Sequence, residues 1–251
     1  MGFSCRLDVF QISQQRQALF VACNFSIMKI TPFLLLLLFV SGCDDHINYF
    51  IPDGFQYPDN KIEKGKTFVY QNNSTQERTF KDLRTLDMDG QHFQTLKSYD
   101  SNSVSDSVKL LNGKSFETFN FFMNKGRNPI KAENLKDTIL NNGQKLGIHL
   151  TERKYQTEQI QYITTSQEQY LKDTTIIWEN SKLLCLVTQA NAKIEIKVKA
   201  DTSINHLTKV VSNFYYAKDI GLIKYSIQFT DQNGKDNYGL WELKSIKNIV
   251  N

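Results

Sequence analysis

The chain lacks any concentrated run of like charges. Its 251 residues include 30 Lys and Arg and 26 Asp and Glu, for a formal net charge of +4, and these residues are dispersed along the sequence. A protein that binds nucleic acid needs a concentrated basic surface to neutralise phosphates. We therefore expect no nucleic-acid partner.

The spacings that hold metals and nucleotides are also absent. The four histidines are far apart, and no His-Glu-x-x-His or paired-cysteine spacing predicts zinc. Gly65 and Gly113 each begin a Gly-Lys-Thr/Ser triplet, but Asn60 and Val108 replace the earlier glycine of a phosphate-binding loop. The segment Asp87–Gly90 lacks the first and last ligands of a calcium loop. We expect no cofactor and no metal.

No catalytic motif is complete. The sequence contains neither a Gly-x-Ser-x-Gly nucleophile elbow nor a dinucleotide-binding glycine run. Carboxylate pairs hydrolyse glycosides only at a defined separation, which depends on the tertiary fold. We assign no catalytic residue, and the alternative of an envelope hydrolase, with a site that assembles only in three dimensions, stays open.

The main apolar run is too short to cross a membrane. Phe33 to Val40 has fewer than half of the roughly 20 apolar residues that a spanning helix needs. Met28 and the basic Lys29 precede the run, and the small residues Ser41 and Gly42 follow it. A basic, apolar and small-residue order is typical of a secretory signal, so the segment predicts export.

The end of this signal, Val40-Ser41-Gly42-Cys43, resembles the lipobox of bacterial lipoproteins. The resemblance implies that diacylglycerol is joined to the Cys43 thiol and that the signal is cut between Gly42 and Cys43. The alternative is an ordinary signal peptide followed by a chance cysteine. Two or more acyl chains, each contributing about 0.8 kcal/mol per buried CH₂, would hold the protein stably at a membrane.

These features divide the chain into a leader, a tether and a domain. Residues 1–42 are the non-mature leader, in which the polar residues 1–27 precede the lipoprotein signal peptide 28–42. We expect translation to start at Met28, the alternative being an unusually long leader. Residues 43–64, with two prolines and scattered aromatics, read as an extended tether that packs partly on the β-rich domain 65–251.

Cysteine usage excludes a disulfide framework. Cleavage would remove Cys5 and Cys23, and lipid would occupy Cys43, which leaves Cys185 alone in an apolar run. No intramolecular disulfide is then possible, although an exported protein could form one. We expect Cys185 to be a buried small hydrophobe rather than a catalytic thiol.

Short β-type runs separated by turn pairs fill the remainder of the chain. Asp89-Gly90 and Asn112-Gly113 are among the pairs that accept positive φ and connect antiparallel strands. Residues 223–229 alternate apolar and polar side chains, as a half-buried strand does. Lys131–Leu140 is predicted as a short helix, and Gln156–Leu171 is ambiguous. The predicted fold class is mainly β, an antiparallel and curved sheet or open barrel or sandwich with little helix.

Phe214–Lys224 reads Phe-Tyr-Tyr-Ala-Lys-Asp-Ile-Gly-Leu-Ile-Lys and resembles a strand-turn-strand signature of β-rich envelope lipoproteins of Bacteroidota. The resemblance implies an antiparallel sheet, curved like periplasmic lipoprotein carriers, and no reaction. On physical grounds Gly221 gives the turn its backbone freedom, so the segment is interpreted as a structural corner.

Asp44, which follows Cys43, supports two conflicting predictions of localisation. It resembles an inner-membrane retention signal of enteric bacteria, whereas acidic residues near this position are associated with surface transport in Bacteroidota. We expect an exported, lipid-anchored protein of the cell envelope, at the outer rather than the inner membrane, with the membrane as its partner through lipid on Cys43.

The predicted role is a non-catalytic module that binds an apolar or glycan ligand or an envelope protein. Trp178 and Trp241 lie in apolar strands, where core packing is expected and a sugar or lipid platform is the alternative. A deep apolar pocket would favour binding, whereas a cleft with converging histidine and carboxylates would favour catalysis.

Overall fold

The computed structural model describes residues 50–62, 64–100, 104–121, 128–143, 145–200, 205–230 and 234–249. These residues belong to one compact unit, Ile47–Asn251. Within these ranges, no helix has both the length and the hydrophobicity that crossing a membrane requires. Gly42 and Cys43 lie outside the described residues, so lipidation and cleavage stay predictions.

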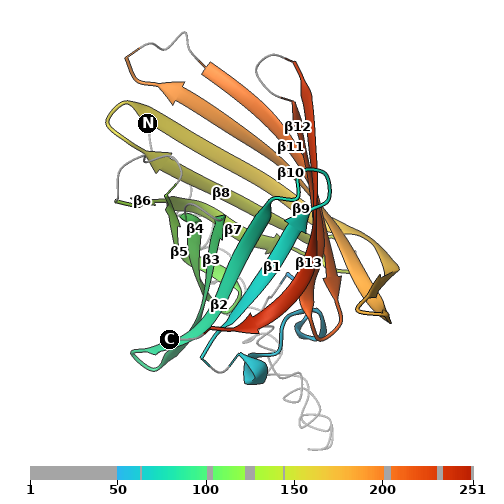
Figure 1. The fold of residues 1–251 in the computed structure, drawn as a ribbon. Helices are drawn as coiled ribbons and strands as arrows, with labels where there is room; N and C mark the ends of the chain where they lie inside the picture. The colour runs from blue at the N-terminus through green and yellow to red at the C-terminus, as the bar shows by residue number, and fades with distance from the viewer. Residues whose placement is uncertain are drawn as a thin grey trace, which may run out of the picture. The chain divides into compact units, whose positions relative to one another are not determined.

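The described strands form a single antiparallel sheet, which confirms the predicted fold class (Figure 1). Two short 3-10 helices, η2 (Asp53–Phe55) and η3 (Asp59–Lys61), precede the strands. The strands are β1 (Lys66–Asn72), β2 (Arg78–Met88), β3 (Gln91–Asp100), β4 (Val104–Leu111), β5 (Lys114–Asn120), β6 (Ile130–Lys131), β7 (Glu133–Leu140), β8 (Ile148–Gln156), β9 (Ile160–Trp178), β10 (Ser181–Val198), β11 (Asn205–Ala217), β12 (Gly221–Thr230) and β13 (Asp236–Asn248). Their order in the sheet is β6-β5-β4-β3-β2-β1-β13-β12-β11-β10-β9-β8-β7.

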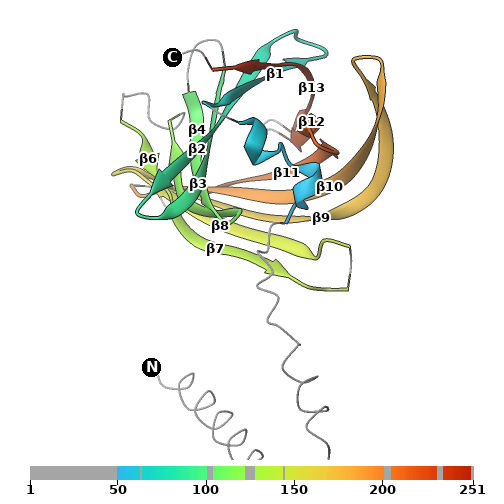
Figure 2. The ribbon, with the colours of Figure 1, turned by 90° about the horizontal axis from the view of Figure 1, so that it is seen from below.

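The two edges of the sheet meet, so the sheet curls into a nearly closed barrel (Figure 2). The chain passes directly from β6 at one edge to β7 at the other, and between them the Ala132 N–H donates to the Thr118 carbonyl at 2.7 Å. Farther along, the Ser115 N–H of β5 donates to the Asp137 carboxylate of β7 at 2.8 Å. Side-chain bonds thus replace a continuous ladder at this seam.

Tight turns connect neighbouring strands as the sequence predicts. Asp89 and Gly90 have φ of 52° and 74°, and Asn112 and Gly113 have φ of 50° and 73°. Two successive positive φ angles give a turn whose twist matches that of the flanking strands. Glu179 and Asn180 turn in the same way between β9 and β10, although their sequence carries no glycine signal.

The short helix predicted for Lys131–Leu140 is wrong, because this segment forms β6, Ala132 and β7. Its apolar residues recur at helical spacing, but β7 pairs with β8 along its length and provides the closing edge of the barrel. The ambiguous segment Gln156–Leu171 is resolved as the end of β8 and the first part of the long strand β9. Pairing with the neighbouring strands overrides the local pattern in both places.

Residues 50–62 lie within the curve of the barrel rather than away from it (Figure 2). Phe50 and Ile62 are buried, and the Tyr57 ring packs edge-on against Phe68 with centroids 5.3 Å apart. The Asp219 N–H, in the turn between β11 and β12, donates to the Gly54 carbonyl at 2.9 Å. This part of the predicted tether therefore packs on the domain and forms one wall of its interior.

The signature segment Phe214–Lys224 is a strand, a turn and a strand, as its resemblance implies. Gly221 has φ of 83°, and a Cβ there would lie 3.1 Å from the Tyr57 backbone nitrogen. Glycine is thus needed for the turn and for the close approach of residues 50–62.

Cys185 has no exposed surface and lies in the main apolar cluster, so its predicted burial is confirmed. Burial raises the pKa of its thiol to about 11, and a protonated thiol is a weak nucleophile.

We expect residues 47–251 to fold without the preceding segment, because their contacts form a compact unit of their own. Circular dichroism of this fragment should show a β spectrum and one cooperative thermal transition. A helical or disordered spectrum would contradict this expectation.

Candidate ligand cavity

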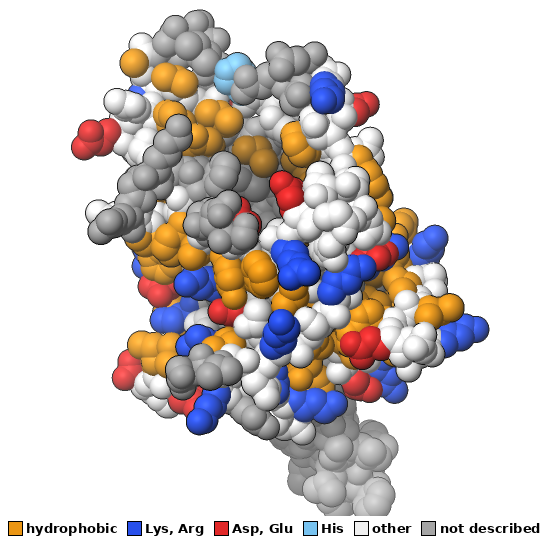
Figure 3. Space-filling model, viewed as in Figure 1, with side chains coloured by type: hydrophobic (Ala, Val, Ile, Leu, Met, Phe, Trp, Pro, Cys, Tyr) orange, Lys and Arg blue, Asp and Glu red, His pale blue; other side chains and the backbone are white. Residues whose placement is uncertain are grey.

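The interior of the barrel contains a cavity of about 340 Å³. Small-molecule sites typically enclose roughly 300–1,000 Å³, so this volume suits a small ligand. On the outside, the face drawn in Figure 3 intersperses hydrophobic, basic and acidic side chains without one dominant charged area. The interior is therefore the better-defined candidate site.

Most of the cavity wall is apolar. Successive side chains of a strand point to opposite faces of the sheet, so every second residue faces the interior. Inward positions of six strands contribute aromatic and aliphatic side chains, and residues 50–57 complete the wall at one side. The apolar and aromatic lining residues are Phe50, Ile51, Phe55, Tyr57, Phe68, Tyr70, Leu83, Leu96, Leu110, Phe214, Tyr216, Ile220 and Leu222. A ligand in this space would contact mainly carbon.

One basic side chain, Lys81, lines this wall from β2. Its ammonium lies over two tyrosine rings, 5.0 Å from the Tyr225 centroid and 5.7 Å from the Tyr70 centroid. It makes no hydrogen bond or ion pair with any other described residue. Burial lowers the pKa of Lys81, and the charge of Asp106 opposes that shift.

Glu168 and His149 line another part of the cavity and are directly opposite each other on β9 and β8. The Thr188 hydroxyl donates to the Glu168 carboxyl at 2.5 Å. Burial nevertheless raises the pKa of Glu168, against the lowering effect of this hydrogen bond.

His149 is held by the seam of the barrel. Its Nε2 lies 2.8 Å from an Asp137 oxygen, and its ring centroid lies 5.2 Å from that of Phe50. Burial alone would raise the pKa of Asp137, but hydrogen bonds from His149 and from the Ser115 N–H outweigh it and lower the pKa. Asp137 is thus a fixed carboxylate that orients the imidazole.

The two polar parts of the cavity lie on opposite walls. In the sheet order, β1, β13, β12, β11 and β10 separate β2 from β9 on one side, and β3 to β8 separate them on the other. No serine, threonine or cysteine is among the residues that line the cavity. Within the described ranges, no group of three potential ligands could hold a metal.

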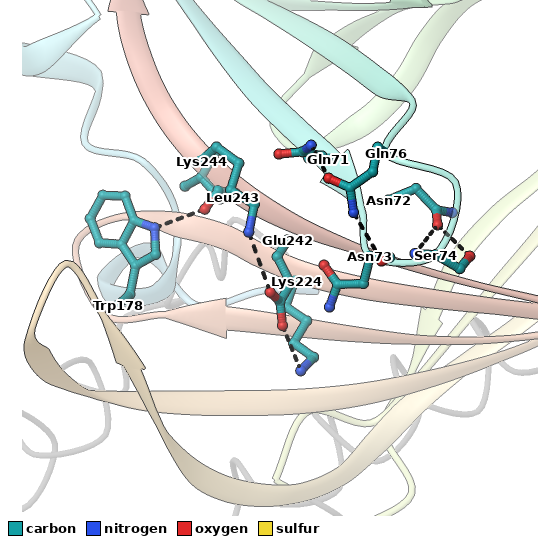
Figure 4. Close-up of polar contacts among 10 residues, drawn as sticks. All are labelled: Gln71, Asn72, Asn73, Ser74, Gln76, Trp178, Lys224, Glu242, Leu243 and Lys244. Carbon is teal, nitrogen blue, oxygen red and sulfur yellow. Dashed lines mark hydrogen bonds and ion pairs between the residues drawn. The ribbon is translucent and has the colours of Figure 1, made fainter.

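Both tryptophans are partly buried and pack against the main apolar cluster, which confirms the expected core packing. The Trp178 Nε1–H, at the end of β9, donates to the Leu243 carbonyl of β13 at 2.9 Å (Figure 4). Trp241 stacks on Tyr225, with centroids 5.1 Å apart and an interplanar angle of 6°. Figure 4 also shows the ion pair between Lys224 and Glu242, 3.0 Å long, which links β12 to β13.

Sequence reasoning did not identify Lys81 or Glu168. Both occupy inward positions of strands, where a charged side chain is unusual. A sequence could reveal such residues where a charged residue occupies a position that the apolar and polar alternation of a strand assigns to the buried side. Around Lys81 the apolar residues Phe80, Leu83 and Leu86 recur every third residue, so no alternation marks the inward side.

No model of a known protein family matches the chain, and no curated protein sequence matches it. Two solved structures are similar to it. One is a protein from Parabacteroides distasonis predicted to be a lipoprotein, with 10% identity and a TM-score of 0.43 over 80% of this chain and 99% of that chain. The other is a protein from Bacteroides fragilis predicted to be exported and described as YmcC-like in fold, with 8% identity and a TM-score of 0.40 over 77% of this chain and 99% of that chain.

Proposed function

We propose that this chain is a lipid-anchored envelope protein whose barrel binds a small, mainly apolar ligand in its interior. The observation that carries the proposal is the cavity of about 340 Å³, which is lined by aromatic and aliphatic side chains and by residues 50–57. The lipobox-like segment ending at Cys43 supports the anchor.

The size of the cavity favours a ligand over imperfect packing. Protein interiors are close-packed, and voids larger than a water molecule are few. An apolar hollow of this size exposes its aromatic and aliphatic lining to water, which is unfavourable. A bound apolar molecule would cover that surface.

The proposed anchor would also bring the cavity close to a source of apolar molecules. Phe50, which lines the cavity, follows Cys43 by seven residues. Seven residues of extended chain span at most about 25 Å. A lipidated Cys43 would therefore keep the barrel within that reach of the bilayer.

Binding can be tested with N-phenylnaphthylamine, a neutral apolar dye that fluoresces when it leaves water. We expect saturable enhancement with residues 47–251. Leu96→Trp places a larger side chain in the cavity and should weaken binding at least tenfold, because it occupies the ligand's volume.

Leu184→Trp is the matched control, because Leu184 is 51% exposed and does not line the cavity. This variant should bind the dye as the unmodified fragment does. The proposal fails if the unmodified fragment shows no saturable enhancement, or if Leu96→Trp is folded and binds equally well.

A further inference from the structure

We infer that the ligand carries an anionic head group, a carboxylate or a phosphate, and that Lys81 binds it. This inference rests on the proposed function and specifies the chemical class of the ligand. The occupant would be an amphiphile with an apolar body against the aromatic wall and one negative charge at Lys81.

Lys81 differs from the other lysines that lie over aromatic rings because it has no ion pair with a described residue. Five described lysines place their ammonium over an aromatic ring: Lys81, Lys109, Lys131, Lys145 and Lys224. Four of them also form an ion pair with a carboxylate, at 3.2 Å for Lys109, 2.9 Å for Lys131, 2.7 Å for Lys145 and 3.0 Å for Lys224. Lys81 alone among the five has no such partner in the described part of the chain.

Lys81 also lines the cavity, which none of the other four lysines does. It faces the interior, with the rings of Tyr70 and Tyr225 beside it, and burial lowers its pKa. An ammonium removed from water is costly unless an anion compensates it, and the tyrosine rings compensate it in part. A ligand anion in the same cavity would provide the missing compensation.

The other titratable groups around the cavity are compatible with an anion. Asp106 on β4 influences Lys81 electrostatically but forms no ion pair with it. Tyr70 donates its hydroxyl proton to the Leu222 carbonyl at 2.7 Å, and Tyr225 bonds Thr79 at 3.0 Å. Glu168 is on the opposite wall of the cavity from Lys81, and burial raises its pKa. Lys81 is accordingly the basic group that meets the ligand.

The pH dependence follows from the lowered pKa of Lys81. The anion preference requires the ammonium form, so it should decrease as pH rises through that pKa, which lies below the usual lysine range. A bound anion stabilises the ammonium and raises the pKa again. Binding near and above the lowered pKa should therefore take up a proton, which makes the calorimetric heat depend on the ionisation enthalpy of the buffer.

The test is displacement of N-phenylnaphthylamine by four ligands with the same chain: dodecanoate, dodecyl phosphate, dodecan-1-ol and dodecylammonium, all below their micellar concentrations. We expect at least one of the anions to compete at a tenfold lower concentration than the alcohol, and the cation to be the weakest. The better anion identifies the head group as carboxylate or phosphate.

Lys81→Met should abolish the difference between the anions and the alcohol while the neutral dye still binds, and Lys81→Arg should retain a preference for anions. Lys109→Met is the matched control, since Lys109 also lies over two rings but does not line the cavity. The inference is overturned if the alcohol competes as well as both anions, or if Lys81→Met keeps the preference. Failure of the dye to bind the unmodified fragment would instead overturn the proposed function.

Discussion

Replacing Cys43 by alanine is expected to move the protein from the membrane fraction to the soluble fraction and to abolish its labelling by a palmitate analogue. The reason is the proposed attachment of lipid to the Cys43 thiol after an export signal. Each buried methylene contributes about 0.8 kcal/mol, so two or more acyl chains hold a protein at a bilayer and their loss releases it. Metabolic labelling followed by fractionation measures both effects.

Cys185→Ala is the matched control for this experiment. Cys185 is fully buried in the barrel, and burial raises the pKa of its thiol, so it should not accept lipid. This variant should be labelled and retained like the unmodified protein. Equal labelling of the Cys43→Ala variant would contradict the lipoprotein assignment.

Replacing Gly239 by alanine should destabilise the barrel by about 2–3 kcal/mol. A Cβ at this position would lie 2.2 Å from the Trp241 ring, which covers the glycine and stacks on Tyr225. The indole would have to rotate out of its packed position and lose that stacking. Urea unfolding of residues 47–251, monitored by circular dichroism, measures the change.

Gly54→Ala is the control, because a Cβ on Gly54 has no atom within 4 Å. Its free energy of unfolding should remain close to that of the unmodified fragment. Combining Gly239→Ala with Trp241→Ala should cost less than the sum of the two single changes, since the second removes the ring that the new methyl group meets. The prediction is contradicted if the two losses of unfolding free energy are additive, or if Gly239→Ala leaves the stability unchanged. Either result would show that the Trp241 ring moves aside without cost.

The alternation of apolar and polar residues predicts some of the side chains on the buried side of the sheet, but not Lys81. Tyr225 could be expected on the buried side, because it alternates with the polar neighbours Lys224 and Ser226 along a predicted strand. Lys81 could not, since the sheet register decides which side of β2 faces the cavity. A shift of one residue in that register would place Lys81 in solvent and Phe80 inside.

The sequence by itself determined the features that depend on neighbouring residues. The β class follows from alternation and from turn pairs such as Asp89-Gly90 and Asn112-Gly113. The export signal and the lipid site at Cys43 are contiguous patterns of the same local kind, and they stay predictions. Each of these signals acts within a few residues, so it can be read without knowing which strands pair.

Only the tertiary structure decided the features that depend on distant partners. Residues 131–140 became strands because they pair with β5 and β8, although Ala132, Leu135 and Ile139 recur at helical spacing. The closure of the barrel through Ser115 and Asp137, and the enclosure of Lys81 by β1, β3 and β12, likewise join residues far apart in the chain. Burial and strand pairing across the whole sheet set these positions, and a local pattern contains no record of either.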